Sequence, residues 1–255
     1  MLNTPTNNTA MMDEAARKYA ALPAIDFLGR IYNFAEVSDL VNRAAKGLQS
    51  HGIGKGDRVG LMLPNCPAMV ISYYAVLRAG ATVVNFNPLY AEAEIRAQIE
   101  DSDCGILITL DMPLIYDKAA KMLGSTQLRT IVLASLAEQL PFPKNLLYRL
   151  LKRKDIATMP SDGRHLSFSE LCSTDGKPST VDINPETDIA VLQYTGGTTG
   201  LPKGAMLTHA NLTTNVQQAT YLFPKTEFGK EVLIGVLPLF HVFAMTVVMN
   251  FSIFA

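Results

Sequence analysis

Residues 54–88 read GKGDRVGLMLPNCPAMVISYYAVLRAGATVVNFNP. This stretch contains a turn, a short apolar run over 59–63, an apolar segment of helical length that ends at Gly80, and a second apolar run. Neither run alternates with polar residues, which is typical of strands that are buried on both faces of a sheet. Two such strands joined by a helix predict a βαβ unit with parallel strands.

The same pattern recurs along most of the chain. An amphipathic helix is predicted over 31–52, and a polar-faced helix over 91–103. Further apolar runs at 104–110, 130–134 and 189–195 read as strands. The sequence therefore predicts an α/β fold of mostly parallel sheets covered by helices on both faces.

Composition restricts the classes of function. The chain has 255 residues, of which 48% are apolar and 18% charged, with a formal net charge of −1. A near-neutral protein lacks the basic surface that nucleic-acid binding needs. No basic region followed by an apolar one opens the chain, so no secretory signal is predicted. Cys66, Cys104 and Cys172 fit neither a metal spacing nor a disulfide framework, which indicates buried or half-buried thiols and a cytoplasmic protein.

Two subdomains are expected from the breaks in the pattern. The first covers 1–175, and the second begins within 176–255 after a turn-rich stretch. A basic amphipathic insert lies near 143–154, where four leucines face five basic residues: Leu146, Leu147, Leu150 and Leu151 against Lys144, Arg149, Lys152, Arg153 and Lys154. It is either a surface helix that packs its leucines on the domain or a helix that lies on an anionic membrane. The modest number of charges favours the first interpretation.

The last 24 residues, from Val232 to Ala255, are apolar enough for two interpretations. A membrane-spanning helix needs about 20 such residues. Pro238 and His241 interrupt the stretch, however, and VLIGV is a β-type run. A buried strand over 232–238, a loop and a buried helix are therefore expected. Because the chain stops inside an apolar stretch, we also expect it to be part of a longer protein.

Residues 193–209, QYTGGTTGLPKGAMLTH, are typical of phosphate binding at the end of a strand. Glycines let consecutive N–H groups approach anionic oxygens, while threonine hydroxyls and Lys203 add donors and a positive charge. A helix is expected to begin near 208–211. The lysine precedes glycine, so the stretch is not a Walker A loop, and the dinucleotide fingerprint is absent. A flexible surface loop of small residues would not explain the lysine or the apolar strand.

Residues 194–212 resemble the signature loop of the adenylate-forming superfamily, which comprises acyl-CoA and aryl-CoA synthetases, luciferases and adenylation domains. Residues 54–90 and LPLFHVFAM at 237–245 resemble further blocks of that superfamily. Gly197 departs from the serine of many members, which removes one hydroxyl. No acid follows Phe240-His241-Val242, which favours an uncharged acyl or aryl substrate over an amino acid. The residues of these blocks look most like those of bacterial long-chain fatty acid–CoA ligases.

The resemblance implies a two-step ligation that uses ATP, Mg²⁺ and CoA. A fatty acid would become an acyl-adenylate and then acyl-CoA. Lys203 and His241 would be catalytic, and Thr195 would also lie near the magnesium ion. The nucleotide-binding set would be Thr195, Gly196, Gly197, Thr198, Thr199, Gly200, Lys203, His241 and Val242. The same resemblance implies a cytoplasmic enzyme with peripheral contact to anionic membrane, which strengthens the membrane interpretation of 143–154.

Several blocks of the superfamily are missing from these 255 residues. They are a Y-G-x-T-E block with the magnesium glutamate, a T-G-D block for the ribose, and the C-terminal lid domain. We therefore expect the chain to be inactive by itself. Two alternatives stay open, namely a medium-chain or aryl-CoA ligase relative, and a short protein that binds nucleotide or membrane without catalysis. The sequence leaves acyl chain length and oligomeric state undecided.

Overall fold

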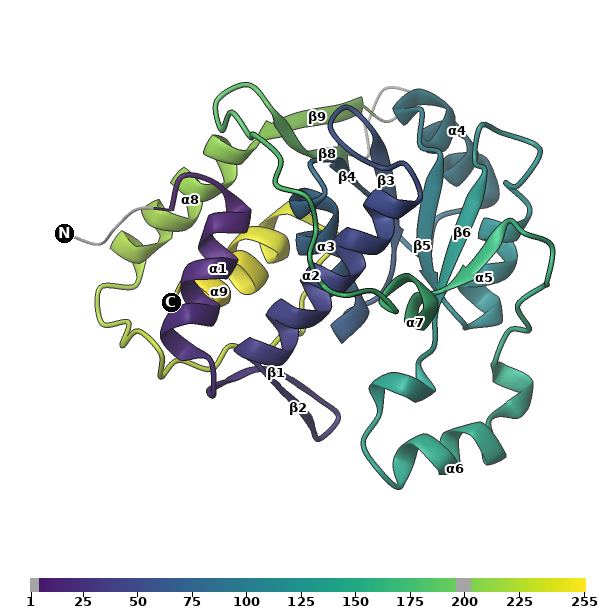
Figure 1. Ribbon diagram of the computed structural model, residues 1–255, viewed down its shortest axis with the longest axis horizontal. Helices are drawn as coiled ribbons and strands as arrows, with labels where there is room; N and C mark the ends of the chain where they lie inside the picture. Colours follow the sequence, from purple (N-terminus) through teal and green to yellow (C-terminus); the bar gives the residue numbers. More distant parts are fainter. Residues whose placement is uncertain (1–4, 196–202) are drawn as a thin grey trace.

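A computed structural model describes residues 5–195 and 203–255. Its centre is a seven-stranded sheet with the strand order β7-β6-β5-β3-β4-β8-β9 (Figure 1). The strands of this sheet are β3 (Arg58–Met62), β4 (Thr82–Asn85), β5 (Ile106–Leu110), β6 (Thr130–Ala134), β7 (His165–Ser167), β8 (Ile189–Thr195) and β9 (Lys203–Thr208). Five of them lie where the apolar runs predict strands.

All pairings in the sheet are parallel except the last, in which β9 runs antiparallel to β8. Strand β5 is buried along its whole length, in keeping with a sequence in which Thr109 is the one polar residue. Strand β8 pairs with β4 and so continues the same sheet. Where the second subdomain begins, which the sequence predicts at 176, stays a prediction.

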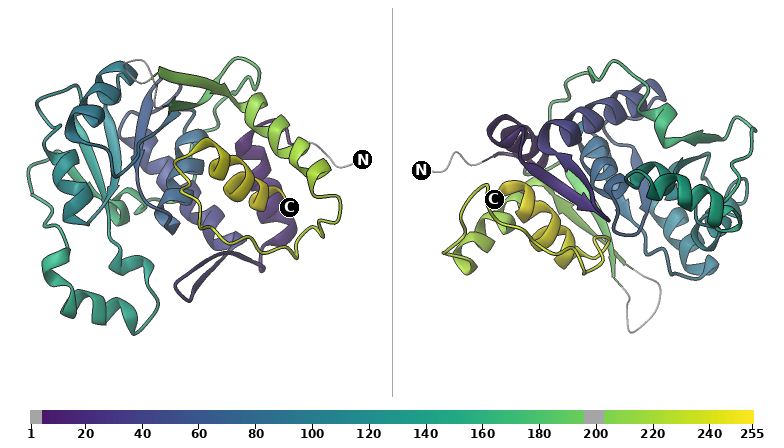
Figure 2. Two further views of the ribbon diagram at one scale, coloured as in Figure 1. Left: turned by 180° about the vertical axis from the view of Figure 1, so that it is seen from behind. Right: turned by 90° about the horizontal axis from the view of Figure 1, so that it is seen from below.

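Helices cover both faces of the sheet, as the sequence predicts. The α-helices are α1 (Asn8–Tyr19), α2 (Phe34–Ser50), α3 (Pro67–Arg78), α4 (Glu92–Ser102), α5 (Pro113–Ala120), α6 (Lys144–Leu151), α7 (Phe168–Leu171), α8 (His209–Leu222) and α9 (Phe251–Phe254). Short helical turns are η1 (Ala137–Gln139), η2 (Arg153–Asp155) and the π-helix η3 (Ala244–Asn250). Helices α2 and α3 cover one face together with α8 and η3, whereas α4 and α5 cover the other (Figure 2).

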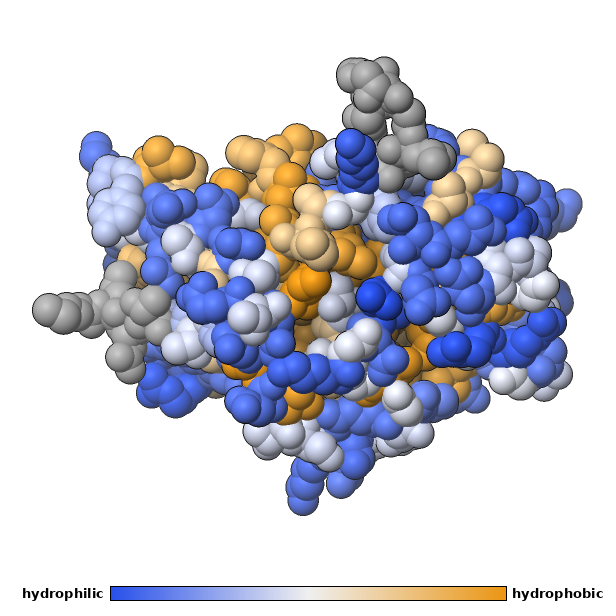
Figure 3. Space-filling model, turned by 90° about the horizontal axis from the view of Figure 1, so that it is seen from above, coloured by the Kyte–Doolittle hydropathy of each residue, from blue (hydrophilic) through white to orange (hydrophobic). Residues whose placement is uncertain are grey.

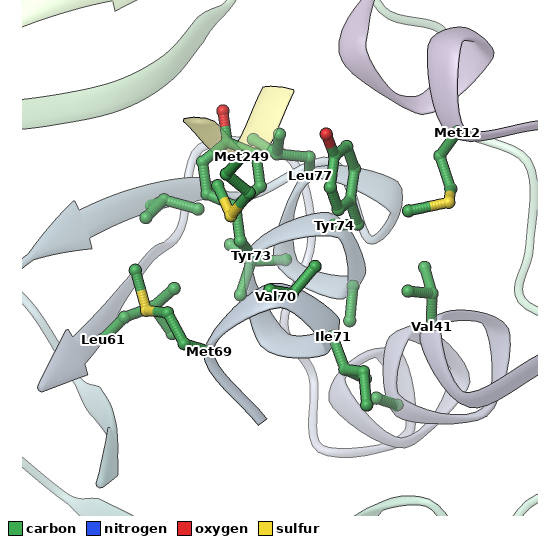
Figure 4. Close-up of a cluster of buried hydrophobic side chains, with 14 of the residues drawn as sticks. Met12, Val41, Leu61, Met69, Val70, Ile71, Tyr73, Tyr74, Leu77 and Met249 are labelled. Atoms are coloured by element: carbon green, nitrogen blue, oxygen red, sulfur yellow. The ribbon is translucent and has the colours of Figure 1, made fainter. Parts of the chain in front are cut away.

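The core is centred on α3, which is apolar around its whole circumference. Pro67 occupies the first helical position, and Gly80 follows the helix with a φ of +87°. Figure 4 shows the side chains of α3 packed against neighbours from α1, α2, β3 and η3. These buried residues include Met12, Val41, Leu61, Met69, Tyr73, Tyr74, Leu77 and Met249.

A separate antiparallel hairpin, β1 (Pro23–Phe27) with β2 (Arg30–Asn33), lies beside the insert that carries α6 (Figure 1). The Lys144 ammonium donates a hydrogen bond of 2.7 Å to the Leu28 carbonyl, and the Arg30 guanidinium donates to the Glu138 carbonyl. The insert projects from the body of the molecule and touches it mainly through these contacts and η1.

The leucines of α6 do not pack on the domain. Their side chains are 49–77% exposed, and the neighbouring Phe142 is 78% exposed. No residue of α6 is buried. The interpretation of 143–154 as a surface helix with leucines packed on the domain is therefore wrong, because the insert stands away from the core.

The C-terminal segment differs from its prediction in one respect. Residues 231–236 form no strand, and Val232, Ile234 and Val236 are 77–89% exposed. A β-type run becomes a strand only beside a pairing partner, and the described residues place none there. The expected buried helix does form, as η3 and α9, and packs beside α8 (Figure 2). Within the described residues, no helix is long and apolar enough to cross a membrane.

Apolar side chains also reach the surface elsewhere. Figure 3 shows them gathered in the middle of the face seen from above, between polar margins. Met206 on the edge strand β9 and Phe243 before η3 are both exposed. The cysteines behave as the sequence predicts: Cys66 and Cys104 are buried, Cys172 is half-buried, and burial raises the pKa of all three thiols to about 12.

Candidate active site at the carboxyl edge of the sheet

Thr195 and Lys203 flank the glycine–threonine loop at the edge of the sheet. Thr195 ends β8 and Lys203 begins β9, and the two residues are register partners in the antiparallel pair. Both are exposed. The predicted binding residues Gly196, Gly197, Thr198, Thr199 and Gly200 lie outside the described residues.

The strand β9 was not predicted, because the sequence indicates a loop that leads directly into a helix. The loop instead joins two strands of a hairpin, and α8 follows β9. The helix begins at His209 with Thr208 as its cap, within the predicted range. Lys203 therefore lies on a strand, and five residues separate it from the helix.

Tyr194 contacts both α4 and β9 at the end of β8. Its hydroxyl donates a hydrogen bond of 2.5 Å to the Asp101 carboxylate on α4. Burial raises the pKa of this tyrosine, and the Asp101 carboxylate raises it further. Its ring also covers Gly204, where an added Cβ would lie 3.0 Å from the ring. Any side chain at 204 would press on Tyr194 and shift the strand that carries Lys203.

His241 lies on a segment without regular structure, and a side chain of the sheet edge holds that segment. The Asn65 amide, just after β3, donates hydrogen bonds of 2.8 Å to the carbonyls of Gly235 and Leu237. Its oxygen accepts a third bond of 2.8 Å from the Leu239 N–H. One amide thus fixes the backbone of residues 235–239, and Phe240 alone separates them from His241.

A second amide attaches the same segment to β8. The Gln193 side chain donates a hydrogen bond of 3.0 Å to the Phe240 carbonyl. Gln193 accepts a bond of 3.0 Å from Asn85, its register partner at the end of β4. The ends of β3, β4 and β8 therefore converge on the turn that precedes His241.

His241 and Val242 are both exposed at the start of the C-terminal helical segment. The His241 N–H donates a hydrogen bond of 3.0 Å to the Pro238 carbonyl. The centroids of the Phe240 ring and the His241 imidazole lie 4.6 Å apart. His241 is therefore not a buried histidine. The imidazole is available to a ligand at the sheet edge.

Sequence reasoning missed Asn65, Asn85 and Gln193. A signal was present for two of them, because Asn85 and Gln193 are polar residues inside otherwise apolar strands. Buried polar side chains need hydrogen-bond partners, so such residues mark places where another segment must be contacted. Which segment they contact is a matter of tertiary structure.

The residues that the structure describes do not form a resident magnesium site. Within residues 5–195 and 203–255, no group of three or more Asp, Glu, His or Cys side chains is arranged to hold a metal ion. Thr195 offers one neutral hydroxyl. Magnesium in nucleotide sites keeps waters and binds one or two carboxylates together with substrate phosphates. Thr195 therefore fits such an ion only if a nucleotide brings most of the ligands.

Comparison with known proteins agrees with this arrangement. The family model described as AMP-binding enzyme matches residues 12–255. The chain belongs to the AMP-binding enzyme family. A long-chain-fatty-acid–CoA ligase of Bacillus subtilis is 41% identical over 99% of the chain and 45% of that protein. One from Yersinia pestis is 35% identical over 93% of the chain and 43% of that protein.

Solved structures of two CoA ligases share the fold. A long-chain-fatty-acid-CoA ligase from Archaeoglobus fulgidus matches 99% of the chain and 46% of its own, with a TM-score of 0.79 and 27% identity. An anthranilate CoA ligase in complex with anthranoyl-AMP matches with a TM-score of 0.75 and 21% identity, which concerns the fold alone. The chain spans less than half the length of these relatives of the AMP-binding family.

Proposed function

We propose that this chain carries the nucleotide-binding part of an ATP-dependent ligase that converts a long-chain fatty acid to acyl-adenylate and then to acyl-CoA. The hydrogen bond from Gln193 to Phe240 carries the proposal, because it joins the strand that leads into the glycine–threonine loop to the turn before His241. The similarity to long-chain-fatty-acid–CoA ligases supports the choice of substrate.

The first step brings two anions together. A carboxylate oxygen forms a bond to the α-phosphorus of ATP, while the bond from that phosphorus to the bridging oxygen breaks and pyrophosphate leaves. In the second step, the CoA thiolate attacks the acyl carbonyl, and the bond to AMP breaks. Adenylation therefore depends on charge neutralisation and positioning more than on proton transfer.

The roles of the residues follow from that requirement. Lys203 would neutralise the outer phosphates at the end of the loop, and Thr195 would donate its hydroxyl there. His241 would bind where carboxylate and α-phosphate meet, with Val242 beside it. A magnesium ion, arriving with the nucleotide, would supply additional charge neutralisation. Gly196 to Gly200 would contribute backbone N–H groups.

Titration of the 255-residue protein with MgATP tests the proposal. We expect binding by calorimetry, and Lys203→Gln should weaken it by about 10-fold, which corresponds to about 1.4 kcal/mol. The matched control is Lys225→Gln, because Lys225 is an exposed lysine far along the chain from the loop. Absence of binding by the unmodified chain would contradict the proposal, as would equal affinity of the two variants.

We also propose that the chain does not complete adenylation by itself. None of its 255 residues supplies the Y-G-x-T-E or T-G-D blocks of the superfamily. ATP–pyrophosphate exchange with a long-chain fatty acid should therefore stay at the background of a Lys203→Gln control. Exchange above that background would show that these blocks are dispensable.

A second proposal concerns location. We propose a cytoplasmic protein that contacts anionic membrane through α6, because the four leucines of that helix and Phe142 are exposed beside a basic cluster. Apolar side chains at the lipid boundary with flanking basic residues are the requirements for interfacial binding. This proposal is independent of nucleotide binding, since α6 and the sheet edge are separate parts of the molecule.

A further inference from the structure

Gln193 is one of the few polar residues buried within the sheet. It lies in β8 between Leu192 and Tyr194, and its side chain is shielded from solvent. Burial of an amide without partners would be costly, so both of its polar atoms must be satisfied. Its oxygen accepts from Asn85, and its nitrogen donates to the Phe240 carbonyl.

The orientation of this amide is dictated by its surroundings. A carbonyl oxygen can only accept, so the Phe240 carbonyl requires the NH₂ end of Gln193. The Gln193 oxygen then faces Asn85, which must present its own NH₂ group. That group also lies 3.3 Å from the Met245 sulfur in η3. Consecutive side-chain contacts of Gln193 and Asn85 thus connect β8 and β4 with the turn at Phe240 and with η3.

Alternation along β8 places Gln193 and Thr195 on the same side of the sheet. Side chains two residues apart in a strand share a face. Val191 packs in the cluster of that face, whereas Leu192 and Tyr194 pack on the opposite one. The Thr195 side chain and the turn held by Gln193 therefore lie over the same face, at the same edge.

We propose that Gln193 is a positioning residue for His241, and that it fixes the imidazole relative to Thr195, which lies two residues later on the same strand. Asn85 keeps the Gln193 amide in its donating orientation. The importance of this positioning rests on the proposed function. There, Thr195 lies beside the outer phosphates, and His241 lies where the carboxylate and the α-phosphate meet.

Gln193→Met tests the inference, because methionine keeps the length of the side chain and removes both hydrogen bonds. The matched control is Gln98→Met. Gln98 is also buried, but the hydrogen bond of its amide, 2.7 Å long, goes to the Asn85 carbonyl and not to the Phe240 turn. Both variants should lose stability, so thermal unfolding alone does not distinguish them.

The distinguishing measurement is the NMR signal of the His241 imidazole, assigned with His241→Gln. Without nucleotide, the signal should shift in Gln193→Met and stay in place in Gln98→Met. The His241 amide, bonded to Pro238, should exchange at least about 10-fold faster only in Gln193→Met. On addition of MgATP, the His241 signal should move in the unmodified protein and in Gln98→Met, and far less in Gln193→Met.

Equal His241 signals and exchange rates in the two variants would overturn the inference. If Gln193→Met does not fold, the unmodified protein still tests the inference. The Gln193 side-chain amide protons should show NOEs to the backbone of Phe240 and His241. Absence of these NOEs would also overturn the inference. If the unmodified protein binds no MgATP, the proposed function fails, whereas the nucleotide-free spectra still decide the role of Gln193.

Discussion

The Tyr74 hydroxyl donates a hydrogen bond of 2.7 Å to the Asn250 side chain, 176 residues further along the chain, in a fully buried site. The Asn250 amide in turn donates to the Tyr73 hydroxyl at 3.1 Å. The two tyrosine rings pack edge to face on α3 (Figure 4). This three-residue network attaches η3, and with it the segment after His241, to the central helix of the core.

Replacing Asn250 should therefore destabilise the whole protein. Asn250→Leu leaves two buried tyrosine hydroxyls without their partner, and each unsatisfied group costs on the order of 1–3 kcal/mol. We expect the free energy of unfolding in urea to fall by about 2–4 kcal/mol. The exposed Asn215→Leu should change it by less than about 0.5 kcal/mol. Similar small changes in both variants would mean that the network contributes little.

Stability should depend on pH through His209, the first residue of α8. Burial lowers the pKa of this imidazole to about 4, although the Asp188 carboxylate opposes the shift. Between about pH 6.5 and 4 the unfolded chain binds the proton and the folded protein does not, so stability falls as the pH falls. Urea unfolding between pH 6.5 and 5 should show a loss that approaches about 1.4 kcal/mol per pH unit.

His209→Gln separates this effect from other titrations. The loss of stability between pH 6.5 and 5 should become shallower in the variant, because glutamine does not titrate. The pKa of Asp162 is also lowered, to about 2 by its hydrogen bond with His165, but its contribution is lost only below about pH 4. An unchanged slope in His209→Gln would show that the imidazole is not kept neutral by the fold.

Membrane contact through α6 should need both its charges and its leucines. Changing Lys152, Arg153 and Lys154 to Glu should lower the affinity for phosphatidylglycerol vesicles, measured by sedimentation, by about 100-fold. Each basic residue near an anionic surface contributes about 1 kcal/mol. Leu150→Ser with Leu151→Ser should also weaken binding, although it leaves the charge unchanged. Both leucines are more than 70% exposed, so neither variant should unfold.

The control for net charge is a triple variant in which Lys177, Lys225 and Lys230 become Glu. These lysines are exposed and lie outside the insert. This control should sediment far more than the α6 triple variant. Equal sedimentation of the two triple variants would attribute binding to overall charge, and unchanged binding by the α6 variant would remove the membrane proposal.

Close packing at Gly60 should make β3 intolerant of any side chain. A Cβ at this position would lie 2.4 Å from the Leu107 side chain and 2.8 Å from the Phe86 ring. Overpacking of this kind costs about 1–3 kcal/mol, so Gly60→Ala should lower the midpoint of thermal unfolding. Gly54→Ala, whose nearest contact is 4.0 Å away, should leave that midpoint almost unchanged. Equal midpoints would show that the sheet yields at Gly60.

Local sequence was sufficient for the strands of the parallel sheet and for the helices between them. A strand buried on both faces has to be mostly apolar, and runs such as 106–110 carry that requirement in their own residues. Strand β9 has no comparable signal, because an edge strand is exposed on one side and forms only by pairing with β8. The run 232–238 shows the reverse case, because its β-type residues form no strand.

Residues that are neighbours in the chain are enough to specify an α/β protein in which a glycine–threonine stretch follows a strand. The place of His241 depends instead on the tertiary structure. Its turn is held by Asn65 and Gln193, which are 174 and 47 residues from their partners at Leu239 and Phe240. Hydrogen bonds between such distant residues leave no periodic pattern, since they depend on which strand ends the folded sheet brings together.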